Sequence, residues 1–138
     1  MLFRSDWVDA ALGEQTHGGL TPFGRAMVRE MNRSGMMVDL AHTSPAAMHQ
    51  ALDETRAPVI WSHAAARALV DHPRNVPDDL LKRLPENGGV VMVTFIASFL
   101  SQEVWDMEET MWDTDAPLGL ISEFRDTWPN WPGRTCCA

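Results

Sequence analysis

Residues 36–42 read MMVDLAH and residues 58–63 read PVIWSH, and these two stretches decide the fold. Each is a short, mostly apolar run that ends on a histidine, His42 in the first and His63 in the second. Continuous apolar runs of this length are typical of strands in a parallel sheet, which is buried on both faces. Residues 90–95 (VVMVTF) form a third such run, and their β-branched residues favour a strand as well.

A helix is predicted to lie before each of these strands. Thr21 and Ser44 are each followed by proline, a pattern typical of an N-cap residue with proline at the first helical position. Gly35 is a plausible stop for the first helix. The third helix opens at residues 75–77 and ends at residues 87–89 (NGG). Parallel strands with helical crossovers follow from this alternation, either in an open doubly wound α/β fold or in part of a (β/α) barrel, which needs eight such units.

The bulk properties favour one globular domain. The chain has 138 residues, 45% of them hydrophobic, and a net charge of −8, which disfavours binding to nucleic acid or to anionic membranes. No apolar run approaches the roughly 20 residues that span a bilayer, and the first residues lack the apolar core of a signal peptide. Cys136 and Cys137 are adjacent and cannot link distant segments. A cytoplasmic location is the expectation.

His42 and His63 are the candidate metal ligands. Both follow consecutive strands, and residues at the carboxyl ends of parallel strands line the functional face of such folds. Neighbouring strands lie roughly 4.8 Å apart, so the two imidazoles can reach one zinc ion, although a zinc site takes three or four protein groups. The alternative is that both histidines are hydrogen-bonded structural residues. His49 is expected to be solvated on its helix, and His72 to lie in a loop.

Arg74 is the candidate substrate-binding residue. It lies just before the third helix, on the side that faces the strand ends, where its guanidinium group could bind a carboxylate with two hydrogen bonds. The alternative is a surface ion pair with Asp71 or Asp78. No residue is assigned a catalytic role.

Taken together, five segments resemble the renal (membrane) dipeptidase family. They are residues 19–24 (GLTPFG), 30–42 (EMNRSGMMVDLAH), 57–63 (APVIWSH), 74–79 (RNVPDD) and 89–95 (GVVMVTF). The resemblance covers about residues 6–100 and fades after that. It implies a TIM-like (β/α)8 metallohydrolase barrel with two zinc ions bridged by a glutamate, in which a metal-activated water cleaves dipeptides. It implies that His42 and His63 bind one of the zincs and that Arg74 holds the terminal carboxylate of the substrate.

The sequence also departs from the family pattern. The N-terminal His-x-Asp motif, the bridging glutamate, a substrate-binding histidine and a later aspartate are all missing, and Thr94 stands where the family has asparagine. The chain is therefore interpreted as an internal fragment, a single partial domain of residues 1–138 with a divergent or irregular tail at residues 101–138. The acidic, tryptophan-rich start of that tail is allowed one helix.

Three hypotheses about function follow. In the first, the parent protein is a zinc-dependent dipeptidase that acts on small dipeptides, with a homodimer left open as its assembly. In the second, this chain alone is catalytically inert because it holds only part of the two-metal site. In the third, it is a small doubly wound binding domain with structural histidines, although no glycine-rich phosphate loop follows any predicted strand.

Overall fold

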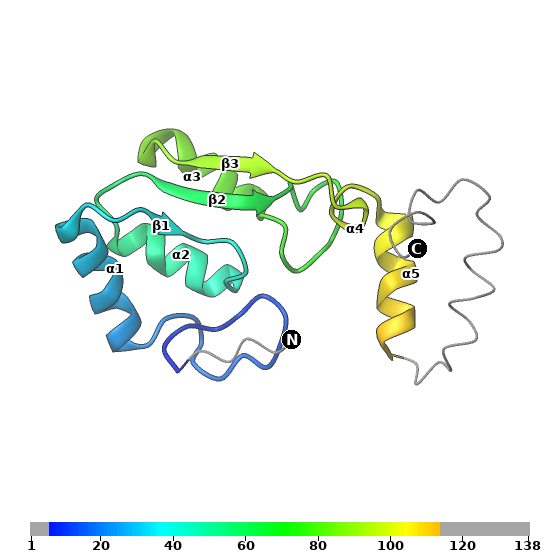
Figure 1. Cartoon of the computed structure of the whole chain (residues 1–138), viewed down its shortest axis with the longest axis horizontal. Coiled ribbons are helices and arrows are strands. Elements are labelled where there is room, and N and C mark those ends of the chain that lie inside the picture. The colour runs from blue at the N-terminus through cyan, green and yellow to red at the C-terminus, as the bar shows by residue number, and fades with distance from the viewer. Residues whose placement is uncertain (1–5, 114–138) are drawn as a thin grey trace, which may run out of the picture. The chain divides into compact units, whose positions relative to one another are not determined.

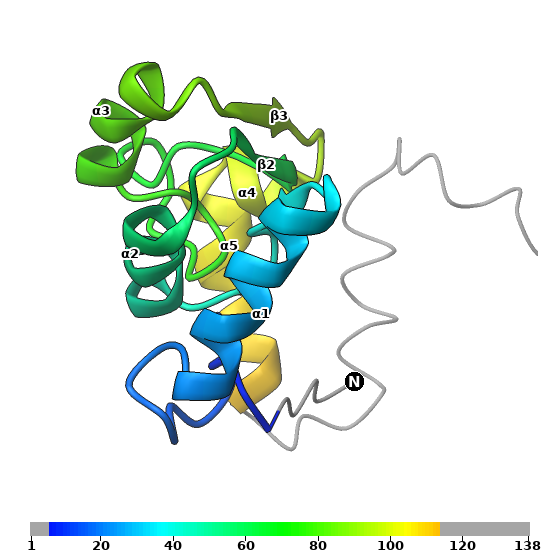
Figure 2. The same cartoon turned by 90° about the vertical axis from the view of Figure 1, so that its left-hand side faces the viewer.

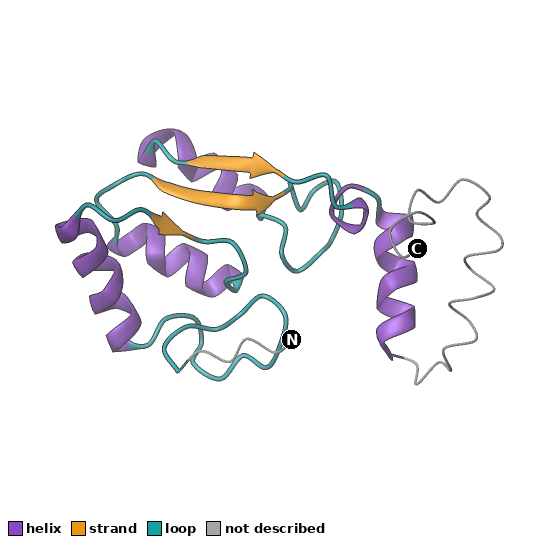
Figure 3. Cartoon of the chain, viewed as in Figure 1, coloured by secondary structure: helices purple, strands orange, loops and turns teal. Residues whose placement is uncertain are grey.

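A three-stranded parallel sheet organises the chain (Figure 1). The computed structural model describes residues 6–113 and the side chains as far as residue 110. The elements are α1 (Pro22–Ser34), β1 (Val38–Asp39), α2 (Pro45–Glu54), β2 (Val59–Ala64), α3 (Asp78–Asn87), β3 (Val90–Val93), α4 (Ala97–Leu100) and α5 (Gln102–Asp113). The strands lie in the order β1-β2-β3, with a helix on each crossover (Figure 3). The predicted α/β arrangement with parallel strands is confirmed.

Two of the predicted helix starts are confirmed by their caps. The Thr21 hydroxyl accepts a hydrogen bond from the Gly24 amide at 3.2 Å, and the Ser44 hydroxyl accepts one from the Ala47 amide at 3.2 Å. Gly35 ends α1 with φ 74°, the left-handed conformation that glycine adopts without steric cost. α3 begins after Pro77 without a side-chain cap, and Asp78 and Asp79 in its first turn suit the positive end of the helix dipole.

The core lies around the central strand β2. The Val59 and Trp61 side chains are fully buried, and so are Met48 of α2 and Leu80 of α3. Figure 2 shows α2 and α3 next to each other, with α1 beside α2. Met48, Ala51 and Leu52 form the buried face of α2.

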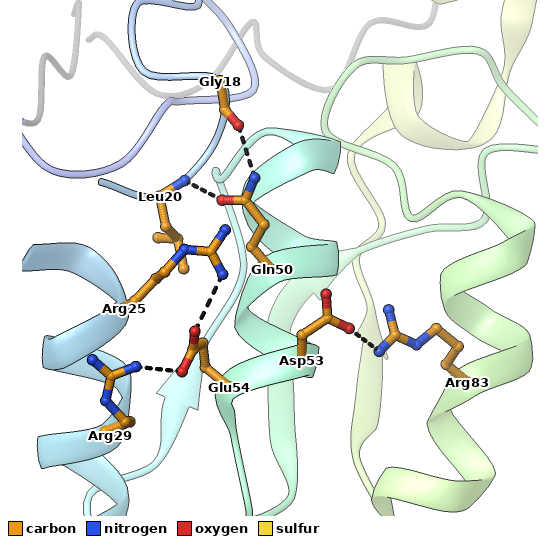
Figure 4. Close-up of polar contacts among 8 residues, drawn as sticks. All are labelled: Gly18, Leu20, Arg25, Arg29, Gln50, Asp53, Glu54 and Arg83. Atoms are coloured by element: carbon orange, nitrogen blue, oxygen red, sulfur yellow. Dashed lines mark hydrogen bonds and ion pairs between the residues drawn. The ribbon is translucent and has the colours of Figure 1, made fainter. Parts of the chain in front are cut away.

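Polar side chains join α2 to α1 and to α3 (Figure 4). Glu54 of α2 accepts hydrogen bonds from Arg25 and Arg29 of α1, and Asp53 of α2 pairs with Arg83 of α3 at 2.6 Å. These pairs are partly exposed, so each contributes little stability. They link α2 to both of its neighbouring helices.

The strands differ in length from the prediction. β1 has only two residues, whereas a strand of five, residues 36–40, was predicted. The Asp39 carboxylate accepts a hydrogen bond from the Ala41 amide at 3.0 Å, which turns the chain out of the sheet. β2 extends to Ala64, so His63 lies inside the strand and not after it. An irregularity in the β2–β3 register between Trp61 and Ala64 accompanies this extension.

β3 is an edge strand with apolar side chains in solvent. Val90, Met92 and Val93 are 52%, 49% and 60% exposed, and Phe95, just after the strand, is 91% exposed. Within residues 6–113, β3 pairs with β2 alone. Three units of a barrel leave strand edges and apolar faces of this kind uncovered.

The segment after β3 is helical in part. α5 occupies the acidic, tryptophan-rich stretch, where one helix was allowed. The chain divides into a compact unit that ends at Trp105 and a second unit that begins at Asp106. The Trp/Pro/Cys ending, with Cys136 and Cys137, lies outside the described residues. None of the described helices has the length and apolar character needed to cross a membrane.

Replacing Gly24 with alanine should destabilise the fold. A Cβ atom there would lie 2.5 Å from the Trp7 carbonyl oxygen, so the first turn of α1 could not stay against the segment before it. We expect the free energy of unfolding in urea to fall by about 1–3 kcal/mol, the usual cost of forcing extra atoms into a packed site. Ala26→Ser, on the exposed face of the same helix, is the control. An unchanged midpoint for Gly24→Ala would contradict the close approach.

Candidate functional site

The structure brings His42, His63 and Arg74 together. The Nε2 atoms of His42 and His63 are 2.8 Å apart, and their rings meet edge to face with centroids 4.9 Å apart. Arg74 Nη2 lies 2.7 Å from the same Nε2 atom of His42. Three residues proposed from sequence, drawn from three separate segments, therefore point at one spot beside the ends of β1 and β2.

Local backbone geometry explains how His42 reaches this spot. It has φ 71°, the only positive φ of a non-glycine residue in residues 6–113. The left-handed region is uncommon for a residue with a side chain and marks a tightly determined turn. The turn is held from inside by Asp39, whose Oδ1 accepts hydrogen bonds from the amides of Ala41 at 3.0 Å and Ser62 at 3.2 Å.

Asp39 thus ties the two histidine-bearing strand ends to each other, a role that the sequence analysis did not assign. Burial acts to raise the pKa of Asp39, but hydrogen bonds from Ser62 and from the Ala41 amide outweigh it and hold the pKa below its usual range. The carboxylate is therefore ionised at neutral pH. A short polar residue at the end of an apolar strand, just before a turn, is the sequence signal that could have revealed it.

The segment before α1 supports the turn from outside. The Ala11 amide donates to the His42 carbonyl at 2.7 Å, and the Ser44 amide donates to the Asp9 carbonyl at 2.8 Å. The Asp9 side chain, only 3% exposed, accepts hydrogen bonds from three amides of its own loop, among them those of Thr16 and Gly19. The loop before α1 is thus fixed by one buried carboxylate.

Arg74 has no ion pair with Asp71 or Asp78 among the described contacts. Asp71 instead pairs with Arg67, whose Nε lies 2.8 Å from Asp71 Oδ1. The guanidinium carbon of Arg74 lies 5.0 Å from the centre of the Phe99 ring. Its Nε atom is buried and has no hydrogen-bond partner within the described part of the chain. Burial lowers the pKa of Arg74 from its ordinary value, but arginine remains charged at neutral pH.

The charge state of His42 suits a metal ligand. Burial lowers its pKa, and the neighbouring Arg74 and His63 lower it further. A neutral imidazole with a free lone pair is the form that binds metal ions. Both Arg74 and His63 are directed at that lone pair.

The two histidines fit a zinc ion as part of a ligand set. Two nitrogen ligands of a tetrahedral zinc lie roughly 3.3 Å apart, and the two Nε2 atoms are 2.8 Å apart, so a small ring movement suffices. Ser62 Oγ lies 2.8 Å from His63 Nδ1, the kind of contact that orients a ligand histidine. No group of three histidine, cysteine or acidic side chains lies close enough to hold a metal ion among the described residues. The remaining ligands would have to come from elsewhere.

The other histidines lie away from this spot or are occupied. His49 was expected to be solvated, but its Nε2 lies 2.9 Å from Asp79 Oδ2 and its Nδ1 lies 3.3 Å from Arg83, which join α2 to α3. His72 is in a loop as predicted, but it is buried. Asn75, next to Arg74, is also fully buried and was not recognised from sequence.

Comparison with known proteins decides the family. The profile of the membrane dipeptidases, peptidase family M19, matches residues 3–123. This chain belongs to the membrane dipeptidase family. The match extends beyond residue 100, where the resemblance by motif fades.

Individual members agree with the assignment. An uncharacterised dipeptidase of Schizosaccharomyces pombe is 57% identical over 96 residues, which are 69% of this chain and 24% of that protein. Dipeptidase tcpJ of Claviceps purpurea is 58% identical over 91 residues, 65% of this chain and 21% of that protein. The chain therefore spans about a quarter of the length of these relatives.

Solved structures match the fold. A probable dipeptidase of Pseudomonas aeruginosa, PvdM, superposes with a TM-score of 0.67 at 33% identity, over 70% of this chain and 26% of that one. A metallopeptidase of Rhodobacter sphaeroides, solved with a phosphinate mimic of L-Ala-D-Ala, gives a TM-score of 0.61 at 34% identity, over 64% and 25%. The expected origin of the parallel strands, as part of a barrel of this metallopeptidase family, is thus confirmed.

Proposed function

We propose that this membrane dipeptidase chain contributes to zinc-dependent hydrolysis of dipeptides by supplying two ligands of a zinc ion and the binding site of the substrate carboxylate. The convergence of His42, His63 and Arg74 carries the proposal. When bound, a zinc ion supplies a water of low pKa and polarises the scissile carbonyl. The chain's own residues bind the metal and orient the substrate.

In this proposal His42 and His63 present Nε2 lone pairs, and Ser62 holds the ring of His63 from its other nitrogen. Arg74 offers the positive charge and the N–H donors of its guanidinium group to the terminal carboxylate of a dipeptide. The guanidinium carbon of Arg74 lies over the Phe99 ring, an apolar surface beside which water competes less for an ion pair.

Zinc binding by the 138-residue chain should depend on both histidines. Because two nitrogen ligands alone hold zinc weakly, we expect calorimetry at high zinc concentration to detect weak binding that the double variant His42→Ala/His63→Ala loses. His49→Ala is the matched control, because His49 bridges α2 and α3 and does not face the site. Zinc that is retained by the double variant would contradict the assignment of these ligands.

The catalytic part of the proposal needs a complete barrel. The 91 residues of this chain that match dipeptidase tcpJ at 58% identity can replace the matching segment of that protein. The chimera should cleave dipeptides, and a chelator or the His63→Ala change should abolish cleavage. Chelator-resistant cleavage would exclude the zinc mechanism.

The chain alone is expected to show no turnover, because two ligands do not make a catalytic zinc site. Chelator-sensitive cleavage by the purified 138-residue chain would disprove this. A small binding domain with structural histidines is not favoured by any described feature, since the family match accounts for both histidine-bearing strands.

A further inference from the structure

His72 is a buried histidine that the proposed function does not use. It lies two residues before Arg74 and is 3% exposed. Its Nδ1 atom accepts a hydrogen bond from the backbone amide of Arg74 at 3.0 Å. The same geometry, a side-chain acceptor bonded to the amide two residues on, is the one that asparagine and aspartate make in Asx turns.

The backbone of His72 fixes the same loop. Its amide donates to the Val70 carbonyl at 2.7 Å, and its carbonyl accepts from the Asn75 amide at 2.9 Å. With the side-chain bond to Arg74, three hydrogen bonds of His72 define the turn from which the Arg74 side chain leaves. The backbone of Arg74, and with it the direction in which the side chain leaves the turn, is therefore restricted.

The imidazole ring of His72 also sets the wall on which Arg74 rests. Its centroid lies 4.2 Å from that of Phe99 and 4.1 Å from that of Trp105. Phe99 in turn lies under the guanidinium group of Arg74. One phenylalanine ring thus contacts both the histidine and the arginine, so a movement of His72 would shift the support of Arg74.

We propose that His72 is a positioning residue that directs the guanidinium group of Arg74 toward His42 through the hydrogen bond that His72 Nδ1 accepts from the Arg74 amide. The proposal rests on the proposed function, in which Arg74 binds the substrate carboxylate. His72 touches neither the substrate nor the metal in this assignment. Its effect is transmitted entirely by Arg74.

The electrostatics of the site agree with this role. Burial lowers the pKa of His72 to about 4, and the positive charges of Arg74 and Arg67 contribute. The ring is therefore neutral at physiological pH, and its Nδ1 lone pair is available to the Arg74 amide. A permanently charged side chain in the same place would repel the guanidinium group that it supports.

Two substitutions separate positioning from simple core packing. His72→Phe keeps an aromatic ring between Phe99 and Trp105 but has no acceptor. His72→Asn loses the ring but keeps an oxygen that can accept from the Arg74 amide. If His72 only filled space, phenylalanine would serve and asparagine would not; a positioning role predicts the reverse for Arg74.

The test is nuclear magnetic resonance of the full 138-residue chain. In the wild type we expect scalar coupling between the Arg74 amide nitrogen and His72 Nδ1 across their hydrogen bond, and a rigid Arg74 Nε–H group by heteronuclear relaxation. His72→Phe should make that group mobile, and His72→Asn should keep it rigid. His49→Phe is the control, because His49 contacts Asp79 and Arg83 and not Arg74. A wild type without the coupling, or a folded His72→Phe chain with a rigid Arg74, would overturn the proposal.

Titration with alanyl-alanine and with its C-terminal amide separates this proposal from the proposed function. We expect a preference for the free carboxylate that Arg74→Met abolishes and that His72→Phe lowers about tenfold, the low end of the effect of residues that orient a binding group. A preference that needs Arg74 but survives His72→Phe intact would overturn the positioning role and leave the function standing. A rigid Arg74 that depends on His72, without any carboxylate preference, would support positioning and contradict the function.

Discussion

Acidification from pH 7 to pH 4 should lower the free energy of unfolding by about 3 kcal/mol through His72 alone, because burial lowers the pKa of this histidine to about 4. In the unfolded chain a histidine has a pKa of about 6.5, so below that pH the unfolded state takes up a proton that the folded state refuses. The loss therefore begins as the pH falls through 6.5 and levels off below 4. Above pH 7 the histidine is neutral in both states and the stability does not change.

Urea unfolding at pH steps between 8 and 4, followed by circular dichroism, measures this effect. His72→Phe is the control, since the difference between the two chains removes the contribution of His42, whose lowered pKa acts in the same direction. Carboxylates with lowered pKa values, such as Asp39, lose their contribution only as the pH falls below about 4. If the free energy of unfolding fell equally with pH in wild type and His72→Phe between pH 6.5 and 4.5, His72 would take up its proton as readily in the folded state as in the unfolded state. That result would contradict the prediction.

The architecture was predictable because local signals and periodicity agreed. Thr21 and Ser44, each followed by proline, cap the helices that they predicted. The apolar runs that end at His42 and His63 form neighbouring parallel strands. Neither observation needs knowledge of distant contacts, since caps and strand periodicity depend on residues close in the sequence.

The limits of the strands were not predictable, because they depend on contacts between separate segments. Asp39 looked like the polar interruption of a longer strand, but its carboxylate bonds the amides of Ala41 and Ser62 and ends β1 early. Likewise, β3 has the composition of a buried strand, yet Val93 is 60% exposed. Composition reports what a strand is suited to contact and not what lies beside it.

The residues whose polar side chains meet in the candidate site were predicted from sequence. His42, His63 and Arg74 were each named, and the structure brings them to one point. The residues that hold them were missed, because their roles come from hydrogen bonds to the backbone. Asn75 is an example, because the sequence of the RNVPDD segment does not indicate whether its side chain faces solvent or lies in the interior.

Asn75→Ala should lower the free energy of unfolding by about 3 kcal/mol or more. The Asn75 side chain is fully buried and makes hydrogen bonds with three backbone groups. Its Oδ1 accepts from the Ala65 amide at 3.0 Å, and its Nδ2 donates to the carbonyls of Val70 at 3.1 Å and Phe99 at 3.0 Å. Alanine would leave all three groups buried without a partner, and each such group costs about 1–3 kcal/mol.

Asn87→Ala is the matched control, measured by urea unfolding in the same buffer. Asn87 also bridges two backbone groups, the Val59 amide at 3.0 Å and the Ala57 carbonyl at 3.2 Å, but it is only half-buried. Water can therefore replace much of what its side chain provides, and its loss should cost less. Equal losses for the two variants would mean that water reaches the Asn75 pocket. We expect the larger loss for Asn75→Ala, together with a more mobile Arg74 side chain in the molecules that stay folded. That result would show that the loop that holds Arg74 in place also contributes to the stability of the chain.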